Sequence, residues 1–240
     1  MDMTIPETMC AVYLTGHGGL EKLEYRDDVP VPRPRADEVL VRVTAAGVNN
    51  TDINTRTAWY SKSVTEATNS GGADGFTDVD ESDGGWAGVA LTFPRIQGAD
   101  VCGYIAQVGS DVDSARIGER VLVRSLMRHY VDNRPYECWT FGSECDGGFA
   151  QFAVAPACET HTVRCDWSDA ELASIPCAYS TAENMLHRAS VKAERVLITG
   201  ASGGVGSAAV QLAKRRDAYV IAMSGADKAD DVKRLGADEV

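Results

Sequence analysis

The glycine-rich segment RVLITGASGGVG, residues 195–206, carries the residue types best suited to chemistry. The apolar run at its start, rich in β-branched residues, ends in a glycine-rich turn, and an amphipathic helix is expected over Ser207–Arg216. Glycines permit a tight turn and a close approach of the backbone to a pyrophosphate, and a helix start favours an anion. The pattern predicts a phosphate-binding turn, with a plain structural turn as the alternative. The predicted contacts are Gly200, Ser202, Gly203, Gly204, Val205 and Gly206.

The elements expected around this turn alternate between strand and helix. Val220–Met223 is predicted to be a second buried strand, followed by a helix near Asp227–Leu235. Upstream, Ser168 with Glu171 three residues later is a capping box, which predicts a helix start. A further helix is predicted over Ala178–Ala189. Such alternation is typical of an α/β domain with a parallel sheet.

The residues up to about Thr162 have an all-β pattern instead. Alternation is strongest in Glu38–Ala45, EVLVRVTA, and the spacers between such runs are rich in Gly, Pro and Asp. Further strands are predicted over Met9–Thr15, Val101–Val108, Arg120–Arg124 and Phe149–Ala155. Short strands at this spacing suggest a barrel or a sandwich. We therefore expect two domains, residues 1–162 and residues 163–240.

A loop-like stretch from Trp59 to Thr92 interrupts the β region. It is rich in Gly, Ser and Asp, and its acidic residues outnumber its one lysine, Lys62. Two interpretations stay open for it. It is either a solvated surface loop, or a loop that contacts substrate or a second subunit, because long loops in compact domains are often functional.

Charge and cysteine content exclude several classes of protein. The net charge is −12 over 240 residues, which disfavours nucleic acid and anionic membranes as partners. The sequence has no apolar run of membrane-spanning length and no visible signal peptide. Its seven cysteines form no CxxC pair and are expected to be reduced thiols. These features predict a soluble cytoplasmic protein that acts on a small-molecule substrate.

A complete doubly wound nucleotide domain needs about six strands. After the glycine turn there is room for one strand, one helix and the start of another strand at Asp238–Val240. The sequence therefore predicts a C-terminally truncated domain with an open sheet edge.

Several motifs together resemble the medium-chain dehydrogenase/reductase superfamily, the group of alcohol dehydrogenases and quinone oxidoreductases. They are PRPRADEVLVRVTAAGVNNTDINTR, GADVCGYIAQVG, DGGFAQFAV, STAENMLHRA and VLITGASGGVGSAAVQLAK. The resemblance runs from about Cys10 to the last residue. It implies an N-terminal GroES-like β-barrel domain followed by the first part of a Rossmann doubly wound parallel sheet. It also implies a homodimer for the full-length form.

The chain departs from the zinc-dependent members of that superfamily at their ligand positions. Asn49 stands where they have the first ligand, a cysteine, and Ala99 stands where they have a histidine. The third ligand survives in the resemblance only as Cys177, before Thr181. Catalytic zinc needs three protein ligands and an open position, and an amide is a poor zinc ligand. No metal is therefore expected.

Without a Lewis acid, a quinone or an activated carbonyl or alkene is an easier substrate than a simple alcohol. Hydrogen-bond donors then stabilise the charge that develops on the substrate oxygen. The resemblance makes Asn49 the candidate donor, with a loop-capping role as the alternative. Asp52 and Arg56 match positions that shape this pocket in the superfamily, and a structural ion pair is their alternative.

The residue at the end of the second Rossmann strand selects the dinucleotide. An acidic residue there favours NAD(H), but this chain has the neutral Ser224, with Lys228 four residues on. NADP(H) is therefore predicted over NAD(H), although neighbouring aspartates weaken the electrostatic attraction. Thr181 matches the residue that faces the nicotinamide in the superfamily, with burial in helix packing as its alternative.

Taken together, the residues predict an NADP(H)-preferring oxidoreductase without catalytic zinc that reduces a quinone or an activated carbonyl or alkene. Two alternatives stay open, a zinc-dependent alcohol dehydrogenase and a non-catalytic nucleotide-binding member of the superfamily. A short-chain dehydrogenase is excluded, because the glycine motif starts near residue 200 and no tyrosine has a lysine four residues later.

Overall fold

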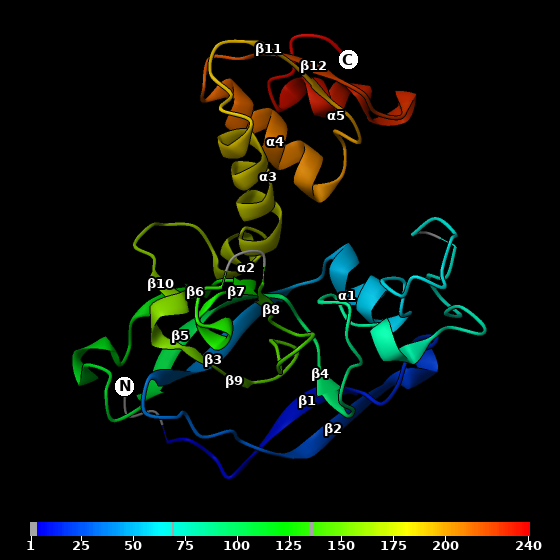
Figure 1. Ribbon diagram of the computed structural model, residues 1–240. Coiled ribbons are helices and arrows are strands. Elements are labelled where there is room, and N and C mark those ends of the chain that lie inside the picture. Colours follow the sequence, from blue (N-terminus) through cyan, green and yellow to red (C-terminus); the bar gives the residue numbers. More distant parts are fainter. Residues whose placement is uncertain (1–3, 69, 135–136) are drawn as a thin grey trace. The chain divides into compact units, whose positions relative to one another are not determined.

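The chain folds as two units, Met1–Pro176 and Cys177–Val240. The computed structural model describes residues 4–68, 70–134 and 137–240 (Figure 1). The first unit extends past the predicted domain boundary at residue 162. The reason is α2 (Asp169–Ala173), whose Leu172 and Ala173 pack with Cys102 against the first unit's sheet.

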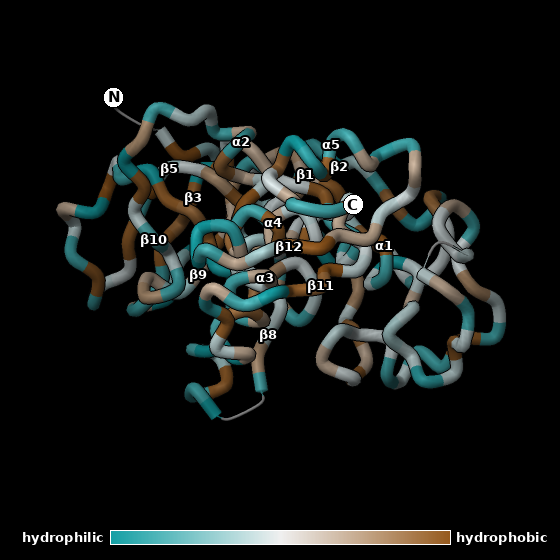
Figure 2. The backbone as a smooth tube through the Cα atoms, turned by 90° about the horizontal axis from the view of Figure 1, so that it is seen from above, coloured by the Kyte–Doolittle hydropathy of each residue, from teal (hydrophilic) through white to brown (hydrophobic). Residues whose placement is uncertain are grey.

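Five antiparallel strands form the main sheet of the first unit, in the order β10-β6-β5-β3-β9. Their bounds are β3 Glu38–Gly47, β5 Asp100–Val108, β6 Arg120–Val123, β9 Phe152–Pro156 and β10 Thr160–Thr162. Alternation in the sequence predicted four of these strands and missed β10. In β3, Val39 and Val41 face one hydrophobic core and Leu40 faces another, and all three are fully buried. The strand therefore separates two cores, and in Figure 2 it is largely brown.

A second antiparallel sheet has the order β2-β1-β4, with bounds Leu23–Pro30, Thr8–Leu14 and Arg95–Ile96. It joins the main sheet through a bridge between Ala11 and Ala150, so the strands curl around the core. This arrangement confirms the GroES-like β domain. The two-residue strands β7 (Leu126–Met127) and β8 (Trp139–Thr140) and the strand β2 were not predicted.

The prediction of an all-β first region is wrong at one place. A seven-residue helix, α1 (Asn50–Arg56), follows β3. Its sequence, NTDINTR, lacks the apolar periodicity that signals a helix. After it, the described residues of the 59–92 stretch form turns, with one short three-ten helix, η2 (Glu81–Asp83). Other three-ten turns are η1 (Leu20–Lys22), η3 (Ser114–Arg116), η4 (His129–Val131) and η5 (Ala157–Glu159).

The second unit has the predicted strand and helix alternation. Its elements are α3 (Pro176–Arg188), β11 (Arg195–Ile198), α4 (Gly204–Lys214), β12 (Tyr219–Ala222), η6 (Ala226–Lys228) and α5 (Ala229–Arg234). The strands β11 and β12 pair in parallel, which confirms a Rossmann-like start. Beyond α5, Glu239 makes a single parallel bridge to Ile221, at the position of the predicted third strand. Small residues of α4, among them Ala208, Ala209 and Ala213, bring that helix close to the strands.

No helix within residues 4–68, 70–134 and 137–240 has the length and apolar character needed to cross a bilayer.

We expect Gly103→Ala to destabilise the first unit. Gly103 of β5 lies opposite Val43 of β3, and an added β-carbon would clash with the Arg42 carbonyl oxygen and lie 2.7 Å from Val41 Cγ1. Overpacking of this kind costs about 1–3 kcal/mol. Urea unfolding followed by tryptophan fluorescence measures the loss. The matched control is Gly16→Ala, whose β-carbon meets only Lys22 Cδ at 4.0 Å, and equal stability of the two variants would contradict the expectation.

Candidate functional site

The predicted catalytic residues of the first unit gather at the start of α1. Asn49 is the N-cap of the helix, with extended backbone angles, and it is partly exposed. Its backbone N–H donates to the Asp52 Oδ2 at 2.8 Å, so the N3 carboxylate satisfies a donor just outside the helix. Asn49 thus occupies the capping position that its alternative interpretation requires. Its side chain also donates a hydrogen bond to Asp100.

The Asp52 carboxylate lies in the interior and binds main chain from a distant segment. Its Oδ1 accepts from the N–H groups of Gly98 at 3.2 Å and Ala99 at 3.1 Å. Gln97 Nε2 in turn donates to the Asp52 carbonyl oxygen at 2.8 Å. Only 5% of Asp52 is exposed. Hydrogen bonds to a charged acceptor each contribute about 1.5–3 kcal/mol, and together they offset part of the cost of burying this group.

Burial nevertheless dominates the ionisation of Asp52. Loss of solvent raises its pKa to about 6, the three backbone N–H groups oppose that rise, and the nearby Asp100 charge adds to it. A carboxyl group with this pKa changes charge around pH 6, about two pH units above an ordinary aspartate. The structure thus gives Asp52 a titratable, buried position that the sequence did not reveal.

Asp100 orients the Asn49 side chain. Asn49 Nδ2 donates to Asp100 Oδ2 at 2.9 Å, and Ser125 Oγ donates to Asp100 Oδ1 at 3.2 Å. Asp100 is 1% exposed, whereas Asn49 reaches the surface. An amide has two N–H hydrogens, so one direction remains for another acceptor. The partnership joins residues 51 positions apart, and no local sequence pattern signals it.

Arg56 lies at the other end of α1, buried with 3% exposure. Its Nη1 donates to the Gly18 carbonyl oxygen at 2.6 Å, and its Nη2 donates to the Gly72 carbonyl oxygen. Burial lowers the pKa of Arg56 and the Glu21 charge opposes this. Asp52 and Arg56 are both described and form no ion pair with each other. Each binds main chain instead, so their substrate contact stays a prediction.

The residues at the positions that match zinc ligands are, taken together, poor ligands for a metal ion. In the first unit they are Asn49 and Ala99, of which Ala99 is 1% exposed; Cys177 belongs to the second unit, in α3. Among the described residues, no three His, Cys, Asp or Glu side chains form a group suited to a metal ion.

The glycine segment of the second unit forms the tight turn that the motif predicted. Gly200 has a positive φ of 61°, which favours glycine. A β-carbon at Gly206 would clash with the Gly200 carbonyl oxygen, so only glycine fits there. Gly203 is the N-cap of α4, and the N–H groups of the first helical turn have no acceptor within the helix. Ser202, Gly203 and Gly204 are exposed, and Val205 is partly exposed.

The turn lies beside the end of β12. The N–H of Ala201 donates to the Met223 carbonyl oxygen at 2.9 Å, so Ser224, the next residue, is close to the turn. Ser224 Oγ donates to the Gly225 carbonyl oxygen at 3.2 Å. Lys228 ends η6 and is exposed. Thr181 lies in α3 and is partly buried. The turn and Ser224 thus lie at one edge of the second unit, and their contacts to a dinucleotide phosphate stay predictions.

The sequence profile named alcohol dehydrogenase GroES-like domain matches residues 35–164. The chain is 32% identical to the chloroplastic quinone-oxidoreductase homolog of Spinacia oleracea and 30% identical to the quinone oxidoreductase of Homo sapiens, over 97% of its length in both cases. It covers 60% and 58% of those two proteins, respectively.

Among solved structures, a Sinorhizobium meliloti protein provisionally described as an alcohol dehydrogenase superposes with a TM-score of 0.82 at 46% identity. That superposition covers 97% of this chain and 62% of the other. The chain therefore belongs to the alcohol dehydrogenase GroES-like family within the medium-chain dehydrogenase/reductase superfamily, as the resemblance indicated.

We expect Asp52 to make stability fall as the pH rises from about 4 to about 6. An unfolded aspartate ionises near pH 3.9, whereas the folded Asp52 has a pKa of about 6. Between these values the unfolded chain is charged and the folded one is still protonated, so ionisation favours unfolding. Above pH 6 the full penalty applies, at most about 3 kcal/mol for a shift of this size.

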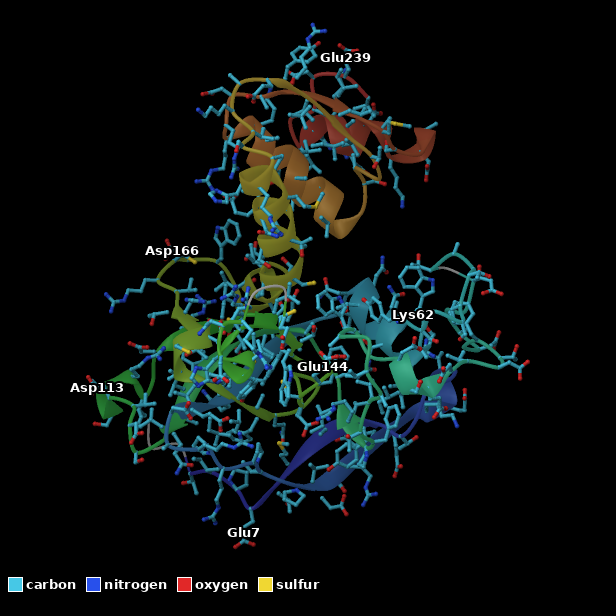
Figure 3. All side chains as sticks on the ribbon, viewed as in Figure 1. Glu7, Lys62, Asp113, Glu144, Asp166 and Glu239 are labelled. Atoms are coloured by element: carbon cyan, nitrogen blue, oxygen red, sulfur yellow. The ribbon has the colours of Figure 1, made fainter. Side chains whose placement is uncertain are left out.

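Urea unfolding of the parent and of Asp52→Asn across this pH range isolates the effect. The difference in unfolding free energy between the two should change with pH in the stated direction. Asp113→Asn is the control, because Asp113 is an exposed capping residue of η3 (Figure 3). A parent and an Asp52→Asn variant with parallel pH profiles would exclude a buried titration at this site.

Proposed function

We propose that this chain contributes to an oxidoreductase that prefers NADP(H), uses no catalytic zinc, and reduces a quinone or an activated carbonyl or alkene. The carrying observation is the hydrogen bond between Asn49 and Asp100. Where the zinc-dependent members have a metal ligand, this chain has the Asn49 amide. Its hydrogen bond to the buried Asp100 carboxylate fixes the orientation of that amide. The names of the spinach and human relatives, a quinone-oxidoreductase homolog and a quinone oxidoreductase, support the substrate class.

In this proposal Asn49 is the donor to the substrate oxygen. When bound, a dihydronicotinamide would supply the hydride, and negative charge would then develop on the oxygen of the substrate. The second N–H of the Asn49 amide donates to that oxygen, while the first stays on Asp100. A donor that is already oriented requires little reorganisation as charge develops, which is the condition for strong stabilisation. Asp52 positions the backbone of Asn49.

The glycine turn supplies the cofactor contacts. The N–H groups at the start of α4 would bind the pyrophosphate, and Ser224 and Lys228 would contact the ribose 2′ position. The neutral side chain at position 224 puts no carboxylate of its own against a 2′-phosphate, although Asp227 and the other neighbouring aspartates weaken the attraction of Lys228. A cytoplasmic location is part of the same proposal, and it rests on the absence of CxxC pairs from the sequence. A homodimer of the full-length form is part of the same proposal.

Two alternatives have distinct signatures. The first is a zinc-dependent alcohol dehydrogenase; the Sinorhizobium meliloti neighbour is described as an alcohol dehydrogenase, and that description names no metal. This alternative predicts stoichiometric zinc by elemental analysis and activity that a chelator removes. A non-catalytic nucleotide-binding protein predicts coenzyme binding with no reduction of a quinone by NADPH.

We expect the chain to bind NADPH more tightly than NADH. Titration followed by nicotinamide fluorescence measures both dissociation constants. Ser224→Asp introduces a carboxylate that repels the 2′-phosphate and accepts from a 2′-hydroxyl, so the NADPH to NADH preference should fall by about tenfold, or 1.4 kcal/mol. Ser202→Asp, in the same turn but before the helix, serves as a charge control that should weaken both coenzymes. A parent that prefers NADH would refute the cofactor assignment.

We expect Asn49→Ala to lower kcat for quinone reduction by about a hundredfold, because an oriented donor at the developing charge is lost. The NADPH dissociation constant should stay unchanged, since the glycine turn is intact. Asn50→Ala is the matched control, because Asn50 is exposed at the first position of α1. Equal kcat values for the two variants, both shown to be folded, would remove Asn49 from the mechanism.

A further inference from the structure

Ser125 is a buried serine that lies next to the proposed reaction site but comes from another part of the first unit. It follows the end of β6 by two residues and is 2% exposed. Its hydroxyl donates to Asp100 Oδ1 at 3.2 Å, and the other oxygen of that carboxylate accepts from Asn49 Nδ2 at 2.9 Å. A single carboxylate therefore connects the Ser125 hydroxyl to the Asn49 amide.

The main chain around Ser125 is held on both sides. Its carbonyl oxygen accepts from the Phe141 N–H at 2.8 Å, and the N–H of the preceding residue, Arg124, donates to the Glu159 carbonyl oxygen at 2.9 Å. The next residue begins β7, which pairs with β8. Because its backbone is fixed by these bonds, Ser125 can hold a partner in place instead of moving with it.

The Asp100 carboxylate needs such a partner. Asp100 begins β5, and the two residues before it donate their N–H groups to Asp52, so its backbone is fixed. The torsion that turns a carboxylate or a side-chain amide about its last bond is broad, however, and a hydrogen bond between two such groups lets both turn together. The bond from Ser125 to Oδ1 fixes the plane of the Asp100 carboxylate and, through it, the direction of Asn49 Nδ2.

We propose that Ser125 is a positioning residue for the reduction and acts through Asp100 on the Asn49 amide. The inference rests on the proposed function, because Asn49 is the donor that this function assigns to the substrate oxygen. Ser125 keeps one N–H of the Asn49 amide on Asp100, so that the second N–H keeps the direction that the substrate oxygen requires. The alternative is a purely structural role, in which Ser125 only satisfies a buried carboxylate.

The length of the bond limits the size of the effect. At 3.2 Å it exceeds the usual O–H···O distance of about 2.5–3.0 Å, so it contributes direction more than energy. Loss of Ser125 should therefore cost less than loss of the Asn49 donor itself. Since a misplacement of about 1 Å can slow a reaction about a hundredfold, we expect a partial loss of direction to lower kcat about tenfold.

Ser125→Ala in the whole chain tests the proposal. We expect kcat for quinone reduction by NADPH to fall about tenfold, with an unchanged NADPH dissociation constant. In an Asn49→Ala background the same substitution should leave kcat unchanged, because the group on which Ser125 acts is gone. Such a double-mutant cycle isolates the coupling between the two residues.

Ser143→Ala is the matched control. Ser143 is 1% exposed, and its Oγ also donates to a carboxylate, that of Glu144, at 3.0 Å (Glu144 is labelled in Figure 3). A purely structural role predicts similar losses of stability for Ser125→Ala and Ser143→Ala, with no selective loss of kcat in the first. Ser125→Cys, which has a similar volume but only a weak S–H donor, replaces Ser125→Ala if that variant does not fold.

A second measurement needs no activity. The side-chain amide signals of Asn49 in a nitrogen–proton NMR spectrum are identified by their loss in Asn49→Ala. In Ser125→Ala these signals should shift, and their hydrogens should exchange faster with water, whereas Ser143→Ala should leave them unchanged. The measurement reports the orientation of the amide directly.

Three results would overturn the positioning role. One is a kcat that Ser125→Ala leaves at the parent value. Another is a loss of kcat that persists at full size in the Asn49→Ala background, or that Ser143→Ala reproduces. The third is a set of Asn49 amide signals that Ser125→Ala does not change. A parent chain that reduces no quinone contradicts the proposed function instead, and the NMR comparison then decides by itself whether Ser125 orients the Asn49 amide.

Discussion

The first unit depends on one buried carboxylate, Asp52, and on the main-chain groups that it holds. Helix α1 is too short and too polar to be stable by itself, because helices of this length are marginal without tertiary contacts. Asp52 joins the start of the helix to the backbone of Gly98 and Ala99. At the far end, Arg56 joins the helix to Gly18 and Gly72. Two oppositely charged side chains of a single helix thus fix separate loops, and neither charge neutralises the other directly.

This constraint also determines where Asn49 and Asp100 meet. The segment held by Asp52 continues directly into β5, whose first residue is Asp100. Because Gly98 and Ala99 cannot shift without breaking their bonds to Asp52, the Asp100 carboxylate is presented to the Asn49 amide at a fixed distance. The raised pKa of Asp52 indicates that its ionised form is destabilised in the folded chain, because desolvation outweighs the three backbone hydrogen bonds that favour the charge. A site that positions a donor in advance commonly accepts such a local loss of stability.

The sequence predicted those features that local patterns encode. The capping box at Ser168 correctly located the start of α2, where Glu171 accepts from the Ser168 N–H at 2.7 Å. The alternation of Glu38–Ala45 located β3, and the glycine turn located the start of α4 to within three residues. Helix α1 was missed because its buried face is made of polar residues, Asp52, Asn54, Thr55 and Arg56. Strand β2 was missed because it lies mostly exposed at a sheet edge. For the candidate site, a family pattern named Asn49, but its partner across 51 residues follows from tertiary structure alone.

The burial of Asp100 gives a physical reason for its pairing with Asn49, and a position-by-position comparison with the zinc ligands does not reveal that reason. A carboxylate that is 1% exposed needs either hydrogen-bond donors or a cation beside it. Here the Asn49 amide and the Ser125 hydroxyl supply the donors. Replacing Asn49 by a cysteine thiolate would put a second anion beside Asp100 and raise the energy of both groups unless a cation came between them. The amide is therefore coupled to the neighbouring carboxylate, and the two residues must be considered as one unit when the site is altered.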